Sequence, residues 1–141
     1  MSATVRSAVV ALAGVLAALP AAADGWSPLS EPAVWVQTRQ QLQASGAMTD
    51  RPWQFMEALE TPELMAGEYL SGRTRTSAGV EFDAGLLLRR DGVEDWQVRE
   101  LRMRALCNQQ RLQRRAGENQ WVDYVGRDDT ASKVAWICDI P

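Results

Sequence analysis

The chain has 141 residues, of which 46% are apolar and 23% charged, and its formal net charge is -3. This length suits one domain rather than two. The chain has no histidine and only two cysteines. These counts exclude a Ser-His-Asp or Cys-His nucleophile, histidine-ligated zinc, and a zinc or iron–sulfur site built from cysteine alone. No cofactor is therefore expected.

Residues 1–23 have the organisation of a secretory signal peptide. Arg6 precedes a 12-residue apolar run, and three alanines that end at Ala23 give the small-x-small pattern of a cleavage point before Asp24. The run is shorter than the roughly 17 to 25 residues of a membrane-spanning helix. The sequence therefore predicts cleavage between Ala23 and Asp24, and export to the periplasm or the cell exterior. The product is a single domain over 24–141 without a transmembrane segment.

The first predicted element of this domain is a helix over 33–44. Ser30 is expected as its N-cap, with Pro32 in its first turn. The apolar residues of the stretch fit helical spacing in part and strict alternation in part, so a strand remains the alternative.

Alternating apolar residues, separated by turn signals such as Ser71-Gly72 and Asp91-Gly92, predict a series of strands after this segment. The expected strands are 53–60, 63–70, 80–88, 100–107, 109–114 and 121–125. The clearest alternation sets one apolar face against one charged face. The apolar face has Leu101, Met103, Ala105 and Cys107, and the charged face has Glu100, Arg102 and Arg104.

A short C-terminal helix is expected to begin at Thr130, with Asp129 as its cap. Its predicted apolar face consists of Ala131, Val134, Ala135 and Cys138. Together the elements predict an α+β fold. It comprises an antiparallel sheet of about five or six strands, this C-terminal helix, an N-terminal helix and one disulfide.

The disulfide is expected between Cys107 and Cys138, because disulfides form and persist in the oxidising compartments that exported proteins reach. Their separation of 31 residues corresponds to a stabilisation of roughly 3 to 4 kcal/mol in the loop-entropy model. No C-x-x-C spacing supports a redox-active pair. Unpaired or intermolecular cysteines remain the alternative.

Arginines are concentrated between residues 89 and 115, where eight of them lie. Arg102, Arg104, Arg111 and Arg114 form a candidate binding face for an acidic protein, a polysaccharide or a lipid headgroup. The alternative is a solvated face whose arginines pair with the chain's own acids. Removal of residues 1–23 leaves 14 basic and 18 acidic side chains, so nucleic acid is not an expected partner.

Tryptophan is the other conspicuous residue, with six in the chain. Core packing is expected for Trp53, Trp121 and Trp136, whereas Trp26 and Trp96 lie in polar contexts and are expected to be exposed. The densest acidic pair is Asp128-Asp129, which helix capping explains without catalysis or calcium binding. The sequence has neither a phosphate-binding glycine loop nor a G-x-S-x-G motif.

In the C-terminal half, a polar strand leads into Cys107 and is followed by an Arg-rich strand, a Trp-bearing segment at 121–124 and an aromatic-x-Cys motif at Cys138. This order of features resembles the surface-adhesin E-like family of exported bacterial proteins, over about half of the chain. The resemblance implies an antiparallel sheet with a helix, tied by a disulfide between the matching cysteines. Named members bind host extracellular-matrix proteins, but no binding residue carries over. Leu106 stands where many members have an aspartate.

The leading hypothesis is a small exported, non-catalytic domain that binds a protein or polysaccharide or is associated with the cell envelope. One alternative is a carboxylate-dependent hydrolase acting on polysaccharide, which needs two Asp or Glu side chains roughly 5 to 9.5 Å apart in a cleft. A structural or assembly subunit of the envelope is a further alternative, and a large exposed apolar patch would favour it.

Overall fold

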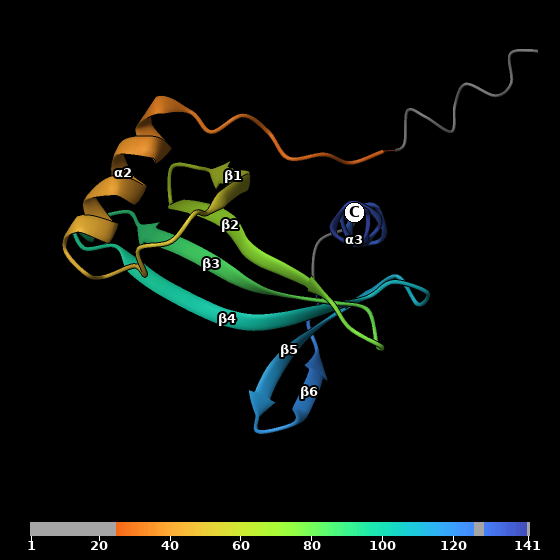
Figure 1. The fold of residues 1–141 in the computed structure, drawn as a ribbon. Coiled ribbons are helices and arrows are strands. Elements are labelled where there is room, and N and C mark those ends of the chain that lie inside the picture. Colours follow the sequence, from red (N-terminus) through yellow and green to blue (C-terminus); the bar gives the residue numbers. More distant parts are fainter. Residues whose placement is uncertain (1–24, 126–128, 141) are drawn as a thin grey trace, which may run out of the picture.

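The structure is a computed structural model that describes residues 25–125 and 129–140. The expected signal peptide, its cleavage point between Ala23 and Asp24, and Asp128 all lie outside the described residues. Figure 1 shows two helices at opposite ends of the long strands of one sheet. In chain order the elements are α2 (Ala33–Ala44), β1 (Gln54–Glu60), β2 (Leu64–Arg75), β3 (Val80–Arg90), β4 (Gln97–Leu106), β5 (Arg111–Gly117), β6 (Gln120–Asp123) and α3 (Thr130–Cys138). None of these helices is long and apolar enough to cross a membrane.

The six strands pair in sequence order, and every neighbouring pair is antiparallel. This confirms the predicted α+β fold, and 33–44 is the helix rather than the strand. The expected turn at Ser71-Gly72 does not end a strand. β2 continues to Arg75, with an irregular register between Ser71 and Thr74. Gly72 has a φ of +65°, and this conformation lets the backbone of β2 bulge at that position. Pairing with β3 then resumes at Thr74.

Neither helix begins with the side-chain cap that the sequence suggested. The cap of α2 is Pro32, whose carbonyl accepts hydrogen bonds from the N–H groups of Trp35 and Val36, so Ser30 was the wrong residue. Asp129 does hold the cap position of α3, but its side chain makes no capping hydrogen bond. The helices are therefore stabilised mainly by packing on the sheet.

The sheet has two faces, each with its own core. The strand register places the two sets of core residues on opposite faces. On the face under α2, called the α2 face, the buried strand residues are Phe55, Tyr69 and Leu87. On the face under α3, called the α3 face, they are Met56, Leu70, Val80, Phe82, Ala84, Met103, Ala105 and Leu112.

Trp35 anchors α2 to the sheet. Its side chain is 1% exposed, and its Nε1 donates a hydrogen bond to Glu60 Oε1 at 2.8 Å. The ring lies directly on Gly67, where an added Cβ would come within 2.5 Å of ring carbon Cζ3. The ring can approach β2 this closely only because position 67 has no side chain.

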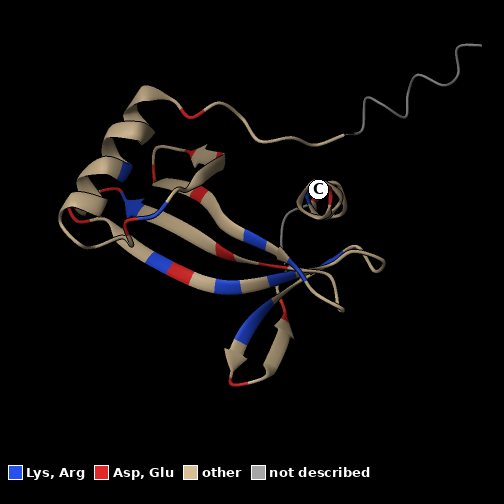
Figure 2. Ribbon diagram, in the orientation of Figure 1, with Lys and Arg blue, Asp and Glu red and all other residues tan. Residues whose placement is uncertain are grey.

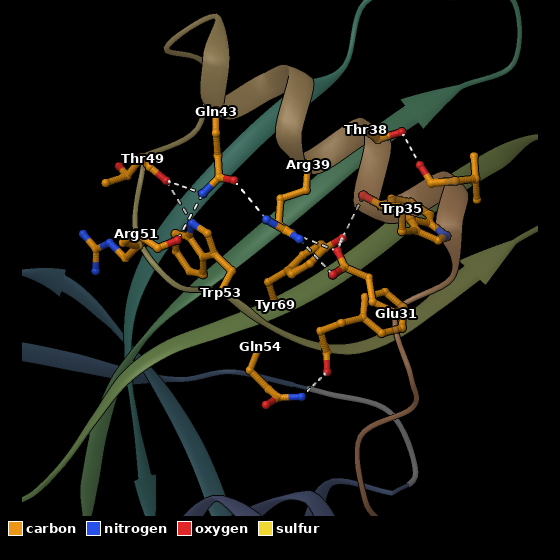
Figure 3. Close-up of polar contacts among 12 residues, drawn as sticks. Glu31, Trp35, Thr38, Arg39, Gln43, Thr49, Arg51, Trp53, Gln54 and Tyr69 are labelled. Carbon is orange, nitrogen blue, oxygen red and sulfur yellow. Dashed lines mark hydrogen bonds and ion pairs between the residues drawn. The ribbon is translucent and has the colours of Figure 1, made fainter.

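A polar network beside Trp35 joins the start of α2 to the sheet. Figure 3 shows Arg39 and Tyr69 directed toward the carboxylate of Glu31. Arg39 donates to both oxygens of Glu31, at 2.9 and 3.1 Å, and the Tyr69 hydroxyl donates to Oε2 at 2.7 Å. Burial first, and then the hydrogen bond to Glu31, raise the pKa of Tyr69 well above its ordinary value. The phenol therefore stays neutral and buried in the folded protein.

The Cys107–Cys138 disulfide joins the end of β4 to the end of α3, as predicted. The buried residues of α3 are Lys133, Val134 and Ile137. Ala131 and Ala135 are exposed, so the predicted apolar face of the helix was wrong at these positions. The helix is rotated toward Lys133 because that side chain finds two carboxylates on the sheet.

Candidate functional site

The sheet brings together only part of the predicted arginine face. The register between β4 and β5 pairs Arg104 with Gln113 and Leu106 with Arg111, so Arg102, Arg104 and Arg111 share the α2 face. Arg114 instead pairs with Met103 and lies on the α3 face. The four arginines therefore do not form one surface, and this part of the prediction was wrong.

The three arginines on the α2 face are held by neighbouring side chains. The partners are Glu81 and Asp83 for Arg102, Gln113 and the Trp121 ring for Arg104, and Asp123 for Arg111. Figure 2 shows basic positions along β4 and β5, with an acidic position on β4 and others on the adjacent strands. The arrangement matches the alternative of a solvated face that pairs with the chain's own acids.

Trp26 and Trp96 are half-buried rather than exposed. Trp26 packs edge-on against Trp136 with 5.8 Å between ring centroids, and Trp96 packs in the same way against Trp35 at 5.5 Å. Both rings lie at the border of a core, where part of the indole is buried and part remains wet. Long-range packing partners, absent from the local sequence, explain the difference from the prediction.

Of the three tryptophans expected in the core, Trp53 is buried, whereas Trp121 and Trp136 are half-buried. A guanidinium group lies over each of these rings. The pairs are Arg51 with Trp53, Arg104 with Trp121 and Arg73 with Trp136. These cations cover ring faces that a sugar would need for stacking.

A groove of about 400 Å³ lies between α3 and the α3 face of the sheet. This volume is in the range of small-molecule sites, about 300 to 1,000 Å³. The groove, called the α3 groove, has an apolar floor and a charged rim. The floor includes Ala66, Leu70, Phe82, Ala84, Leu86 and Leu88, and the rim includes Glu57, Glu68, Lys133 and Arg99.

The groove is open because α3 covers only part of its face. Leu86 and Leu88 on β3 are only half-buried, and Leu59 on the neighbouring part of β1 is 38% exposed. Alternation places all three on the α3 face. An apolar strip of the sheet therefore remains in contact with water beside α3.

Lys133 forms the inner wall of the groove with two glutamates. Its Nζ donates to Glu57 Oε1 at 2.7 Å and to Glu68 Oε1 at 3.1 Å, and the side chain is buried. Burial lowers the pKa of Lys133, but the charges and hydrogen bonds of Glu68 and Glu57 together raise it by more. Lys133 therefore remains a cation in the folded protein, which suits a structural ion pair and not a nucleophile.

No pattern in the sequence predicted this cluster. Lys133 is the single lysine of a chain that has 14 arginines. This exception was the one feature of the sequence that could have drawn attention to it. Its partners Glu57 and Glu68 are 76 and 65 residues away along the chain. No local pattern contains such a contact.

Glu57 and Glu68 lie directly opposite each other on β1 and β2. The groove thus contains a carboxylate pair, as the polysaccharide hydrolase alternative requires. However, both carboxylates accept hydrogen bonds from one buried ammonium group, which occupies the space between them. A glycosidic oxygen would have to displace Lys133 to reach the pair, so the geometry favours a structural role.

We expect the free energy of unfolding to be constant from about pH 6 to 9, because no histidine titrates there. It should then fall as the pH rises above about 10, where Tyr69 and Lys133 lose protons in the unfolded chain but keep them in the folded protein. Urea unfolding across this range measures the profile. Tyr69→Phe should reduce the alkaline decline, and a wild-type profile that stays level to pH 11 would contradict the assignment.

Within residues 25–125 and 129–140, no three Asp, Glu or Cys side chains gather closely enough to hold a metal ion. Comparisons of the chain with protein-family models, with curated proteins and with solved structures give no match. The resemblance to the surface-adhesin E-like family stays a prediction, and the function must be argued from the chemistry of the α3 groove.

Proposed function

We propose that this chain is an exported, non-catalytic binding domain and that the α3 groove is its ligand site. The observation that carries the proposal is the apolar floor, which α3 covers at Leu70 and Phe82 but leaves half-buried at Leu86 and Leu88. A ligand that covers this floor gains about 25 cal/mol for each Å² of apolar surface removed from water. The signal-peptide pattern of residues 1–23 and the disulfide support export.

The groove has stronger support than the arginine face, whose cations already have partners on the α2 face. It also has stronger support than an envelope assembly surface. Of the six strongly exposed large apolar residues in the described chain, Val125 lines the groove and Leu59 lies on the same face of the sheet. The six are Leu29, Val34, Leu59, Val93, Val122 and Val125.

A neutral fluorescent probe, Nile red, tests the groove without involving charge. We expect the purified protein to bind it and to enhance its fluorescence. Ala66→Phe places a ring over the floor of the groove and should weaken binding about tenfold or more, since a filled site no longer buries the probe.

The matched control is Ala116→Phe, because Ala116 is exposed on β5 and does not line the groove. This variant should bind Nile red as the wild type does. Thermal unfolding of both variants verifies that they remain folded. Absence of binding by the wild type, or equal binding by both variants, would contradict the proposed site.

A further inference from the structure

We propose that the ligand of the α3 groove is a single-chain fatty acid, with its alkyl chain on the apolar floor and its carboxylate at Arg99. The inference rests on the proposed function and names the class of molecule that the groove takes. It is supported by the position of Arg99, by the state of the other charged groups on the rim and by the volume of the groove.

Arg99 lies on the groove side of β4. It pairs with Leu86 on β3, and Leu86 pairs in turn with Glu68 on β2, so the three side chains form one row across the α3 face. Arg99 also lines the groove itself. A cation thus stands next to the apolar floor, on the side away from the glutamates.

Of the two cations that the structure describes on the rim, Arg99 is the exposed one. Among the residues that the structure describes, no acidic side chain forms an ion pair with it. Lys133, in contrast, is buried and donates to both Glu57 and Glu68. A guanidinium group presents parallel N–H donors that match the two oxygens of a carboxylate.

The strand pairing leaves the Arg99 side of the groove accessible. β5 pairs with β4 only from Met103 to Leu106, so the stretch of β4 that contains Arg99 is not bordered by β5. Arg99 is exposed, whereas Phe82, also part of the lining, is buried. A ligand bound along this direction keeps its polar end in water and its apolar end under α3, as an amphipathic molecule requires.

The charges on the rim also set the orientation. Glu68 is two strands away from Arg99, about 10 Å at the usual strand spacing. A carboxylate at Arg99 is therefore attracted at close range and separated from Glu57 and Glu68. In the reverse orientation, the ligand carboxylate would lie beside the carboxylates of Glu57 and Glu68 and be repelled by them. The four charged rim residues that the structure describes sum to zero, so selectivity among them depends on this arrangement and not on net charge.

The volume of the groove suits a single alkyl chain. A volume of 400 Å³ holds roughly a dozen groups of the size of a water molecule, at about 30 Å³ each. This matches one alkyl chain of medium length, such as that of dodecanoate.

The test measures displacement of Nile red from the purified protein by dodecanoate and by dodecanol, which have the same number of carbon atoms. Arg99→Gln should weaken dodecanoate about three- to tenfold, as expected for one charge-assisted contact near water, and leave dodecanol unchanged. Arg115→Gln is the matched control, because Arg115 is exposed on β5 and pairs with Trp121 on the α2 face. It should change neither ligand. From decanoate to dodecanoate, affinity should rise about fourfold for each methylene group.

The outcomes separate the two proposals. If Nile red binds but dodecanoate does not displace it, or Arg99→Gln weakens both ligands or neither, the fatty-acid inference is overturned and the groove remains a binding site. Binding to phosphatidylglycerol vesicles without binding of free dodecanoate also overturns it. If the wild type binds neither Nile red nor dodecanoate, both proposals fail together.

Discussion

Replacement of both Cys107 and Cys138 by serine should lower the free energy of unfolding by roughly 3 to 4 kcal/mol. The disulfide closes a separation of 31 residues, and without it the unfolded chain gains the corresponding loop entropy. It also connects α3 to β4. The helix is also held by the packing of Val134 and Ile137, by the ion pairs of Lys133, and by hydrogen bonds that Arg73 and Arg75 on β2 donate to carbonyls of its last turn.

Urea unfolding of the wild type and the double variant measures this difference. Mass spectrometry with and without reductant provides the control, since the wild type should gain two hydrogen atoms on reduction and the variant none. Because α3 forms one wall of the groove, the double variant should also lose affinity for Nile red. A change in stability below about 1 kcal/mol, well under the usual cost of removing a native disulfide, would show that the other contacts of α3 hold it without the disulfide.

Truncation of Trp35 to alanine should cost about 3 to 5 kcal/mol, the usual range for a buried tryptophan. The change removes the largest contact between α2 and the sheet, as well as the hydrogen bond to Glu60. Gly67→Ala should cost about 1 to 3 kcal/mol in the wild-type background, because the new Cβ would overlap the Trp35 ring.

The two substitutions together should cost less than the sum of their separate effects, by about 1 kcal/mol or more, since the truncated residue 35 no longer opposes a Cβ at position 67. Denaturant unfolding of the four proteins in this cycle measures the coupling. Gly117→Ala is the control glycine variant, because a Cβ there meets only Gln120 Oε1 at an ordinary 3.5 Å. If the free-energy costs of the two substitutions were strictly additive, the position of the Trp35 ring would not depend on Gly67.

Most of the fold was predictable from the sequence because it depends on local patterns. The alternation in 100–107 identifies β4 and the side of it that is buried. Short connections between successive strands favour an antiparallel sheet in chain order. Two cysteines permit a single intramolecular pairing, which the structure contains. The error at Ser71-Gly72 was also local, since the same residues can end a strand or form a bulge within one.

The candidate site was not predictable in this way. A pattern along the chain relates a residue to neighbours two to four positions away, but the α3 groove depends on register between strands and on the rotation of one helix. Lys133 turns inward toward two distant glutamates, while Arg114 falls on the face opposite Arg104.

By itself, the sequence determined the strands, the helices and the disulfide, because each is encoded in residue type and local spacing. The tertiary structure alone decided that α3 covers only part of its face, that Leu86 remains half-exposed and that Arg99 stands beside it without an acidic partner among the described residues. These features arise where elements far apart in the chain pack together. Packing of that kind follows the shape and charge of whole surfaces and not the period of any one segment.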